Sequence, residues 1–318
     1  MRHTRSRRLR VRAGISVMVI STMFTGVACS SQGTTATRSA GSNTRPSTQV
    51  DVGQELRKLE TSYKGRLGAF AIDTGTGKAV SYRPNERFAS DSTFKAPLCG
   101  AVLHKARTSD PALLRKNLRW TKDDLVANSP ITSNERSLAG GLTVWQLCQA
   151  TITTSDNTAA NLLLKQIGGP AGVTRFYRSL GDRFGRVDRF EPEHSYWKVG
   201  DVQGTVTPAS MAGTLQKLTL GSALVPQDRQ QLLTWMRGNY TGNMHIRAGL
   251  PDTWTVGDKT GHGFYYGTGG DIAVVHPPSG APLIIAIYSH RHAENGKSDP
   301  KIFGKVTKVL LRGLGRMS

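Results

Sequence analysis

Strand-type patterns in this chain are confined to two separate parts of the sequence. Near residue 70 two apolar runs, 67–72 and 79–82, flank the turn-forming stretch 73–77, which is typical of a β-hairpin. Three further apolar runs lie toward the C-terminal end, at 253–256, 272–276 and 282–289. The stretch between the two parts has mostly helical patterns, so the strands of both parts are expected to form one antiparallel sheet of five strands.

Helical patterns account for most of the rest. The middle of the chain is expected to form a group of helices, and one further helix is expected at each end of the folded part. The clearest patterns are a stretch with Leu56, Leu59 and Tyr63 on one face, 142–152, 158–167 before Gly168-Gly169-Pro170, and 300–314.

These patterns predict an α+β fold of the α-β sandwich type. Terminal helices would flank the antiparallel sheet, and an all-helical lobe would be inserted between its strands in the sequence. The folded domain is expected over 51–318. Its sheet lobe would comprise 51–88 and 240–318, and its helical lobe 89–239. A cleft between two such lobes is a natural place for a functional site.

The N-terminal residues are typical of an export signal. Residues 1–28 contain six arginines and no acidic residue, followed by an apolar stretch that is too short for a stable membrane span. Cys29 then follows Ala28, which leaves two readings open: lipidation of Cys29 or plain cleavage before it. Residues 29–50 are rich in Ser, Thr and Gly and are expected to form a tether. The protein is therefore expected to be secreted or anchored to the outer face of the cell membrane.

The net charge of the chain is +20, and +14 remains without the arginines of residues 1–28. Such a charge favours anionic partners but is also consistent with an ordinary solvated surface. Aromatic residues make up 7% and are not interleaved with a basic run, so nucleic-acid binding is not expected. The histidines are scattered, and no metal site or cofactor is predicted.

Four short motifs carry residue types that suit acyl transfer. Ser92-Thr93-Phe94-Lys95 places a hydroxyl and an amine three residues apart, on one face if a helix begins there. Ser155-Asp156-Asn157 offers a second hydroxyl and an amide, although the same residues suit a helix cap. Each of these motifs alone is weak evidence, because chance matches are common.

The other two motifs lie nearer the C-terminus. Lys259-Thr260-Gly261 follows a predicted strand, where a cation, a hydroxyl and a glycine could receive a carboxylate. Arg189-Phe190-Glu191-Pro192-Glu193 lies on a non-helical stretch, where Glu191 could activate a water molecule. The ordinary alternatives are a strand-end lysine and a charged loop.

Together, in this order, the motifs resemble those of the class A serine β-lactamases of the actinobacterial type. The resemblance extends from about residue 52 to the C-terminus and includes longer stretches. These are Ser129-Pro130-Ile131-Thr132, Trp235-Met236-Arg237-Gly238-Asn239, Ile246-Arg247-Ala248-Gly249-Leu250-Pro251 and Gly257-Asp258-Lys259-Thr260-Gly261.

The resemblance implies a monomeric enzyme with β-lactam antibiotics as substrates. Ser92 would be the nucleophile, Lys95 and Ser155 would move protons, and Glu191 would activate the deacylating water. The backbone N–H groups of Ser92 and His262 would form the oxyanion hole. Asn157, Lys259, Thr260 and Gly261 would bind substrate. It also implies a disulfide between Cys99 and Cys148, which from the residues alone could equally be two buried thiols.

Several positions depart from the family pattern. Ser195 stands where the family has an asparagine that helps to hold the hydrolytic water. Gly204 stands where an aspartate closes the Glu191 loop against Arg189, unless Asp201 substitutes. His245 and Gly269 stand where an arginine normally meets the substrate carboxylate, and Asn128 replaces an aromatic residue. We therefore expect weakened deacylation, and better activity at mildly acidic pH if His245 becomes charged.

Two other functions remain open at this point. The first is a penicillin-binding or DD-peptidase-like acyl-enzyme that deacylates too slowly to protect a cell, which Ser195 and Gly204 would favour. The second is a basic lipoprotein that binds anionic wall polymer without catalysis. The ordered set from Ser92 to Lys259 argues against the second.

Overall fold

The computed structural model describes residues 51–317. The predicted signal peptide (1–28), the tether (29–50) and the lipidation candidate Cys29 lie outside the described residues. Within them, no helix is long and apolar enough to cross a membrane.

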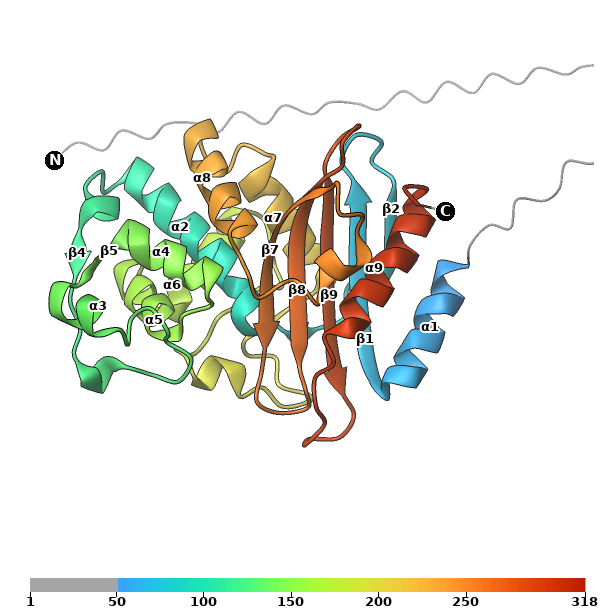
Figure 1. Cartoon of the computed structure of the whole chain (residues 1–318), viewed down its shortest axis with the longest axis horizontal. Coiled ribbons are helices and arrows are strands. Elements are labelled where there is room, and N and C mark those ends of the chain that lie inside the picture. The colour runs from blue at the N-terminus through green and yellow to red at the C-terminus, as the bar shows by residue number, and fades with distance from the viewer. Residues whose placement is uncertain (1–50, 318) are drawn as a thin grey trace, which may run out of the picture. The chain divides into compact units, whose positions relative to one another are not determined.

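A five-stranded antiparallel sheet forms the centre of the fold, as predicted (Figure 1). Its order, β2-β1-β9-β8-β7, places strands from the two ends of the chain side by side. In this register Phe70 pairs with Ser81 on one side and with Ala286 on the other. The strands are β1 (Gly65–Asp73), β2 (Ala79–Tyr82), β7 (Thr255–His262), β8 (Gly269–His276) and β9 (Leu283–Arg291).

Strand β7 differs from the prediction in its extent. The sequence predicted a strand that ends at Val256, with Lys259-Thr260-Gly261 following it, whereas β7 continues through these residues to His262. Pairing with β8 over the whole length explains the difference, since Lys259 lies opposite Ile272 and Gly261 opposite Gly270. The motif therefore lies on an edge strand, with its backbone fixed by the sheet.

Two helices cover one face of the sheet, α1 (Val52–Tyr63) and α9 (Lys301–Leu314), also as predicted (Figure 1). They pack against each other and enclose an apolar layer that includes Leu56, Ile285, Phe303 and Leu310. The N-terminus of α1 is capped by Asp51, whose carboxylate accepts from the N–H of Gln54 at 2.9 Å.

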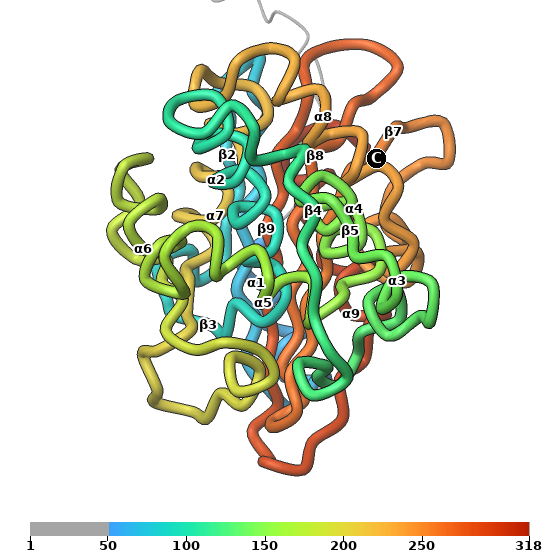
Figure 2. The backbone as a smooth tube through the Cα atoms, turned by 90° about the vertical axis from the view of Figure 1, so that its left-hand side faces the viewer, coloured from blue at the N-terminus to red at the C-terminus, as the bar shows by residue number. Residues whose placement is uncertain are grey.

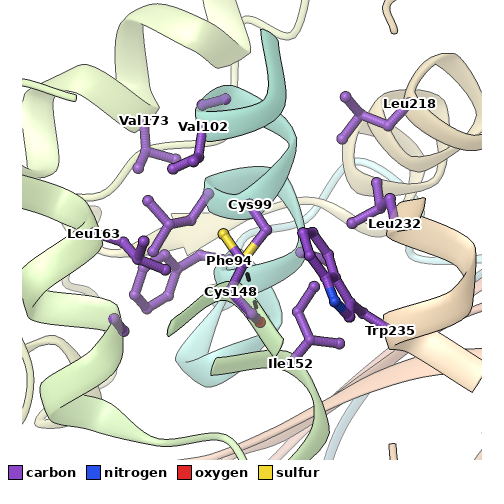
Figure 3. Packing of buried hydrophobic residues seen from close by; sticks show 14 of the residues in the cluster. Phe94, Cys99, Val102, Cys148, Ile152, Leu163, Val173, Leu218, Leu232 and Trp235 are labelled. Atoms are coloured by element: carbon purple, nitrogen blue, oxygen red, sulfur yellow. Dashed lines mark hydrogen bonds between the residues drawn. The ribbon is translucent and has the colours of Figure 1, made fainter. Parts of the chain in front are cut away.

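The other helices lie on the opposite side of the sheet, where the view in Figure 2 meets them first. Helix α2 runs through their middle and is buried from Lys95 to Leu103, because other helices and the sheet surround it. Phe94 and Trp235 belong to this second core (Figure 3). The helices are α2 (Lys95–Thr108), α3 (Glu135–Gly140), α4 (Val144–Thr153), α5 (Asn157–Gln166), α6 (Pro170–Ser179), α7 (Pro208–Thr219) and α8 (Pro226–Arg237).

Short elements complete the fold. Two short strand pairs join β3 (Phe88–Ala89) to β6 (Thr205–Val206) and β4 (Asn117–Leu118) to β5 (Leu142–Thr143). Over residues 51–317 there are also five short 3₁₀ segments: η1 (Asp91–Phe94), η2 (Leu113–Arg115), η3 (Lys122–Asp124), η4 (Glu193–Ser195) and η5 (Ile246–Gly249).

The two cysteines of the described residues correct one prediction. The family resemblance implied a disulfide between Cys99 and Cys148, but both are free in this structure. They lie in the core where α2 meets α4 (Figure 3), and the thiol of Cys99 is directed at the backbone oxygen of Cys148, 3.7 Å away. Burial raises the pKa of the Cys148 thiol, which therefore packs as a neutral group in the apolar core.

Candidate active site

A cleft of about 360 Å³ is lined by residues of three of the predicted motifs, and Glu191 of the fourth motif lies beside it, 3.7 Å from Lys95. Its walls are the end of β7, the loop before α5, the segment η1 and the loop that carries η4. The side chains that line it are mainly small and polar. They include Ser92, Asn128, Ser155, Asn157, Ser195, Thr241, Thr260, Gly261, His262 and Phe264.

Ser92 lies in η1, one turn before α2, and this position aligns it with Lys95. The preceding residue, Asp91, has a φ of 40°, an unusual conformation for a residue with a side chain. The sharp turn leaves the Ser92 hydroxyl facing the cleft, and the ammonium of Lys95 donates to it at 2.9 Å. The predicted contact between the two side chains is therefore present.

Lys95 is fully buried and surrounded by oxygen atoms. Its Nζ lies 2.8 Å from the backbone oxygen of Ser155 and 2.5 Å from Oδ1 of Asn157. A carboxylate oxygen of Glu191 lies 3.7 Å away. Burial lowers the pKa of Lys95, and the nearby carboxylate of Glu191 only partly opposes this effect. An amine in this setting can give up its proton more readily than an exposed lysine.

The Ser155-Asp156-Asn157 segment both caps a helix and contributes side chains to the cleft. Asp156 is the N-cap of α5 and accepts from the N–H of Ala159 at 2.8 Å. The same carboxylate accepts from the N–H groups of Ile131 and Thr132, each at 2.9 Å. Asp156 thus holds the loop in place, while Ser155 and Asn157 face the cleft.

Lys259, on β7, approaches the Ser155 hydroxyl, which Lys95 also contacts. Its Nζ donates to Ser155 Oγ at 3.1 Å and to the backbone oxygen of Thr260 at 2.9 Å. Burial, followed by the charge of Lys95, lowers the pKa of Lys259 to about 7. The hydroxyl of Ser155 therefore lies between two buried amines, which suits proton transfer through it.

Gly261 is required by a close approach of two backbones. A Cβ atom on this residue would lie 2.9 Å from the backbone nitrogen of Ser92, which is too close for any other residue. The end of β7 thereby comes against the nucleophile, and His262 follows as the next residue of the strand.

Thr241 lines the cleft but belongs to none of the sequence motifs. Its hydroxyl and that of Thr260 are hydrogen-bonded across the end of the cleft. It is one polar residue in a loop with no recognisable motif, so only the fold reveals its position.

Glu191 is held from two sides, and both contacts involve residues whose contribution the sequence did not reveal. Its backbone N–H donates to Oδ1 of Asn161 at 2.9 Å, and the Asn161 amide donates to the Glu191 backbone oxygen at 2.8 Å. Ser195 Oγ donates to Glu191 Oε2 at 2.9 Å. The serine that departs from the family pattern thus fixes the carboxylate directly.

The loop around Glu191 is also closed, although Gly204 lacks a carboxylate. Asp201 substitutes, with a carboxylate oxygen 3.2 Å from the Arg189 guanidinium. Gly204 itself has a φ of 62°, and a Cβ atom there would lie 3.2 Å from the ring of His194. The buried His194 ring fills this space and bonds to Ser90 Oγ at 2.9 Å, so a side chain at 204 would need both a strained backbone and a shift of this ring.

His245 does not behave as the sequence suggested. It is 3% exposed, and burial followed by the nearby His262 lowers its pKa to about 3. It therefore stays neutral at mildly acidic pH, and the expected rise in activity through a charged His245 is not supported. Gly269 provides no charge either, and a Cβ there would lie 3.1 Å from the Phe303 ring, a tight contact that favours glycine.

Asp91, beside the nucleophile, is a buried carboxyl that the sequence did not single out. It is fully buried, and neither carboxyl oxygen has a hydrogen-bond partner in the described residues. Burial raises its pKa to about 7, which the nearby Thr268 hydroxyl opposes and the charge of Glu191 reinforces. The folded protein therefore keeps this proton up to about pH 7, whereas the unfolded chain loses it near pH 4.

We expect Asp91→Asn to become more stable relative to the natural protein as the pH rises from 4 to 8. Ionisation of Asp91 is disfavoured only in the folded state, so it costs stability through this window, up to about 4 kcal/mol from the shift between pKa 3.8 and about 7. Urea unfolding of both proteins at several pH values measures the difference. Asp252→Asn, at an exposed position, is the control; a difference that does not change with pH would disprove the assignment.

Comparison of the sequence with known proteins identifies relatives of this chain. Residues 51–314 match the model of the beta-lactamase enzyme family. A beta-lactamase of Amycolatopsis lactamdurans is 44% identical over 264 residues, 83% of this chain and 85% of that protein. The carbapenem-hydrolyzing beta-lactamase KPC of Klebsiella oxytoca is 45% identical, over 83% of this chain and 89% of its own length.

Solved structures agree with the sequence relatives. The beta-lactamase from Streptosporangium roseum superposes with a TM-score of 0.82 at 51% identity, over 84% of this chain and 99% of that one. The beta-lactamase from Streptomyces albus G gives a TM-score of 0.80 at 41% identity, over 82% and 98%.

Proposed function

The chain belongs to the family of class A serine β-lactamases, and we propose that it hydrolyses β-lactams through an acyl-enzyme on Ser92. The observation that supports this mechanism most is the 2.9 Å contact between the hydroxyl of Ser92, which lines the cleft, and the buried amine of Lys95. A nucleophile and a base within hydrogen-bond reach are what acyl transfer requires.

In the acylation step, Ser92 Oγ attacks the carbonyl carbon of the lactam and its proton passes to the neutral amine of Lys95. The backbone N–H groups of Ser92 and His262 receive the oxyanion. As the C–N bond breaks, Ser155 donates a proton to the leaving nitrogen and is supplied in turn by one of the two amines that contact it.

The remaining predicted residues would orient the substrate. Lys259 and Thr260 would bind its carboxylate, and Asn157 its side-chain amide. Gly261 would leave room for the acyl group beside the backbone of Ser92. A cationic residue and a hydroxyl on a fixed strand suit a carboxylate, because the sheet holds both groups in place.

In the deacylation step, Glu191 would remove a proton from a water molecule as its oxygen attacks the ester carbon. The Ser92 oxygen then leaves and regains a proton from Lys95, which in turn recovers the proton that Glu191 took from the water molecule. Oε2 of Glu191 is held by Ser195, whereas Oε1 is buried, has no hydrogen-bond partner among the described residues and lies 3.7 Å from the Lys95 amine. Ser195 and the ion pair between Arg189 and Asp201 hold this carboxylate and its loop in place, which supports deacylation that keeps pace with acylation.

The alternative functions are less well supported. A penicillin-binding protein is not favoured, since the relatives are β-lactamases and Glu191 is held beside Lys95. Export, with either lipidation of Cys29 or plain cleavage before it, a monomeric state and the division into two lobes remain part of this proposal.

The test is an assay with a chromogenic cephalosporin in large excess, together with intact mass at several times. Sustained product release with little adduct is expected, and an adduct seen early should be lost in Ser92→Ala. A single burst that leaves a stable adduct would contradict hydrolysis and point instead to a penicillin-binding acyl-enzyme.

A further inference from the structure

Two histidines of the described residues meet at the edge of the cleft, and the proposed mechanism uses neither imidazole. The Nε2 atoms of His245 and His262 are 3.1 Å apart, and their ring centroids are 5.0 Å apart. His245 is buried, whereas the ring of His262 is exposed and lines the cleft. The two Nε2 atoms therefore converge at a place that solvent can reach past His262.

From this juxtaposition we propose that His245 and His262 form a binding site for a divalent transition-metal ion such as Zn²⁺, Ni²⁺ or Cu²⁺. Imidazole nitrogen is a preferred ligand for these ions, with Zn–N distances of about 2.0–2.1 Å. Two nitrogens 3.1 Å apart fit a single zinc ion at an N–Zn–N angle of about 98°, given that bond length. A tetrahedral angle needs a separation of about 3.4 Å, which a small rotation of the exposed His262 supplies.

The neighbouring structure fixes one ligand and leaves the other adjustable. His245 packs against the ring of Phe303, with centroids 5.0 Å apart. Its backbone is held where the N–H of Ile246 donates to the carboxylate of Asp271 at 3.0 Å. A rigid first ligand reduces the entropy lost on binding, as preorganised sites do.

Water molecules would complete the coordination. Among the described residues there is no cluster of three or more His, Cys, Asp or Glu side chains that could hold a metal. The site is therefore of the two-ligand kind, exchangeable rather than structural, with open positions on the cleft side. The ion would occupy the end of the cleft where Lys259 and Thr260 are proposed to receive the substrate carboxylate.

Titration calorimetry with ZnCl₂ on the metal-free natural protein tests the site directly and does not depend on hydrolysis. One zinc ion per chain is expected, with no binding of Mg²⁺, because magnesium prefers oxygen ligands. Either His262→Asn or His245→Gln should weaken zinc binding at least about tenfold. Loss of a residue that only hydrogen-bonds to a metal ligand already lowers metal affinity by about this factor. The matched control is His104→Asn, at an exposed position on α2.

Imidazole NMR signals of the natural protein give a second measurement, which remains informative if His245→Gln fails to fold. Zinc should shift the signals of His245 and His262 and leave that of His104 unchanged. Zinc binding that is equal in the natural protein and His262→Asn, or no binding at millimolar zinc, would overturn the site.

Inhibition is the functional consequence and rests on the proposed hydrolysis. Zinc should slow turnover of the natural protein, EDTA should reverse this, and His262→Asn should resist it relative to its own metal-free rate. Equal inhibition of both proteins would place the ion elsewhere. A protein that binds zinc but hydrolyses no β-lactam would contradict only the proposed function.

Discussion

Glu191→Gln should convert steady hydrolysis into one round of acylation per protein molecule. The substitution keeps the shape of the side chain but removes its basicity, and only the proposed deacylation step uses that basicity. We expect kcat to fall about a thousandfold, within the range for loss of a general base. The rate of adduct formation should change far less. Intact mass with a slowly hydrolysed β-lactam should show a stable adduct on the variant.

The surroundings of Glu191 make this a specific test. Because Ser195 Oγ can donate to a glutamine oxygen as it does to the carboxylate, the loop should keep its conformation. Glu193→Gln is the matched control: this carboxylate is exposed, lies two residues away and should leave turnover unchanged. If Glu191→Gln also fails to acylate, the carboxylate takes part in the acylation step, and the assignment of Lys95 as the base of that step is wrong.

The sheet and the motif residues could be predicted because their signals are local. An apolar run between turn residues predicts a strand wherever it occurs, and all five strands were found in this way. Ser92 and Lys95 were paired correctly because three residues along a helix bring two side chains onto one face. The full length of β7 could not be predicted, because Lys259 is polar by sequence and buried only through its partners in the fold.

The features that the sequence did not reveal depend on contacts between distant segments. Nothing at Gly204 indicates that the ring of His194 fills the space beside it. The positive φ and buried carboxyl of Asp91 follow from the way β7 and the β7–β8 loop pack against η1. The resemblance implied a disulfide between Cys99 and Cys148, whereas both cysteines are free. The sequence could not decide this, because two cysteines that are close together in a core can form a disulfide or remain two thiols.

Lys95→Met should abolish acylation and thus lower kcat/KM, whereas Glu191→Gln should mainly lower kcat. Methionine has nearly the same length but carries no amine, so the Ser92 hydroxyl loses the base that contacts it. We expect kcat/KM to fall about a thousandfold, again within the range for a general base, and no adduct to accumulate. Some stability should be lost as well, because each buried oxygen left unpaired costs about 1–3 kcal/mol; rates are therefore compared per folded molecule. Lys165→Met, on the exposed side of α5, is the control.

The pH dependence separates a base from a structural lysine. Burial lowers the pKa of Lys95, so the natural protein should lose kcat/KM as the pH falls through that pKa and the amine becomes protonated. The residual activity of Lys95→Met should lack this acid limb, since no titrating amine remains at the position. A variant that retains the same limb would assign it to another group and would contradict the role of Lys95 as the base. Taken with the Glu191→Gln experiment, the two profiles assign each proton transfer to one side chain.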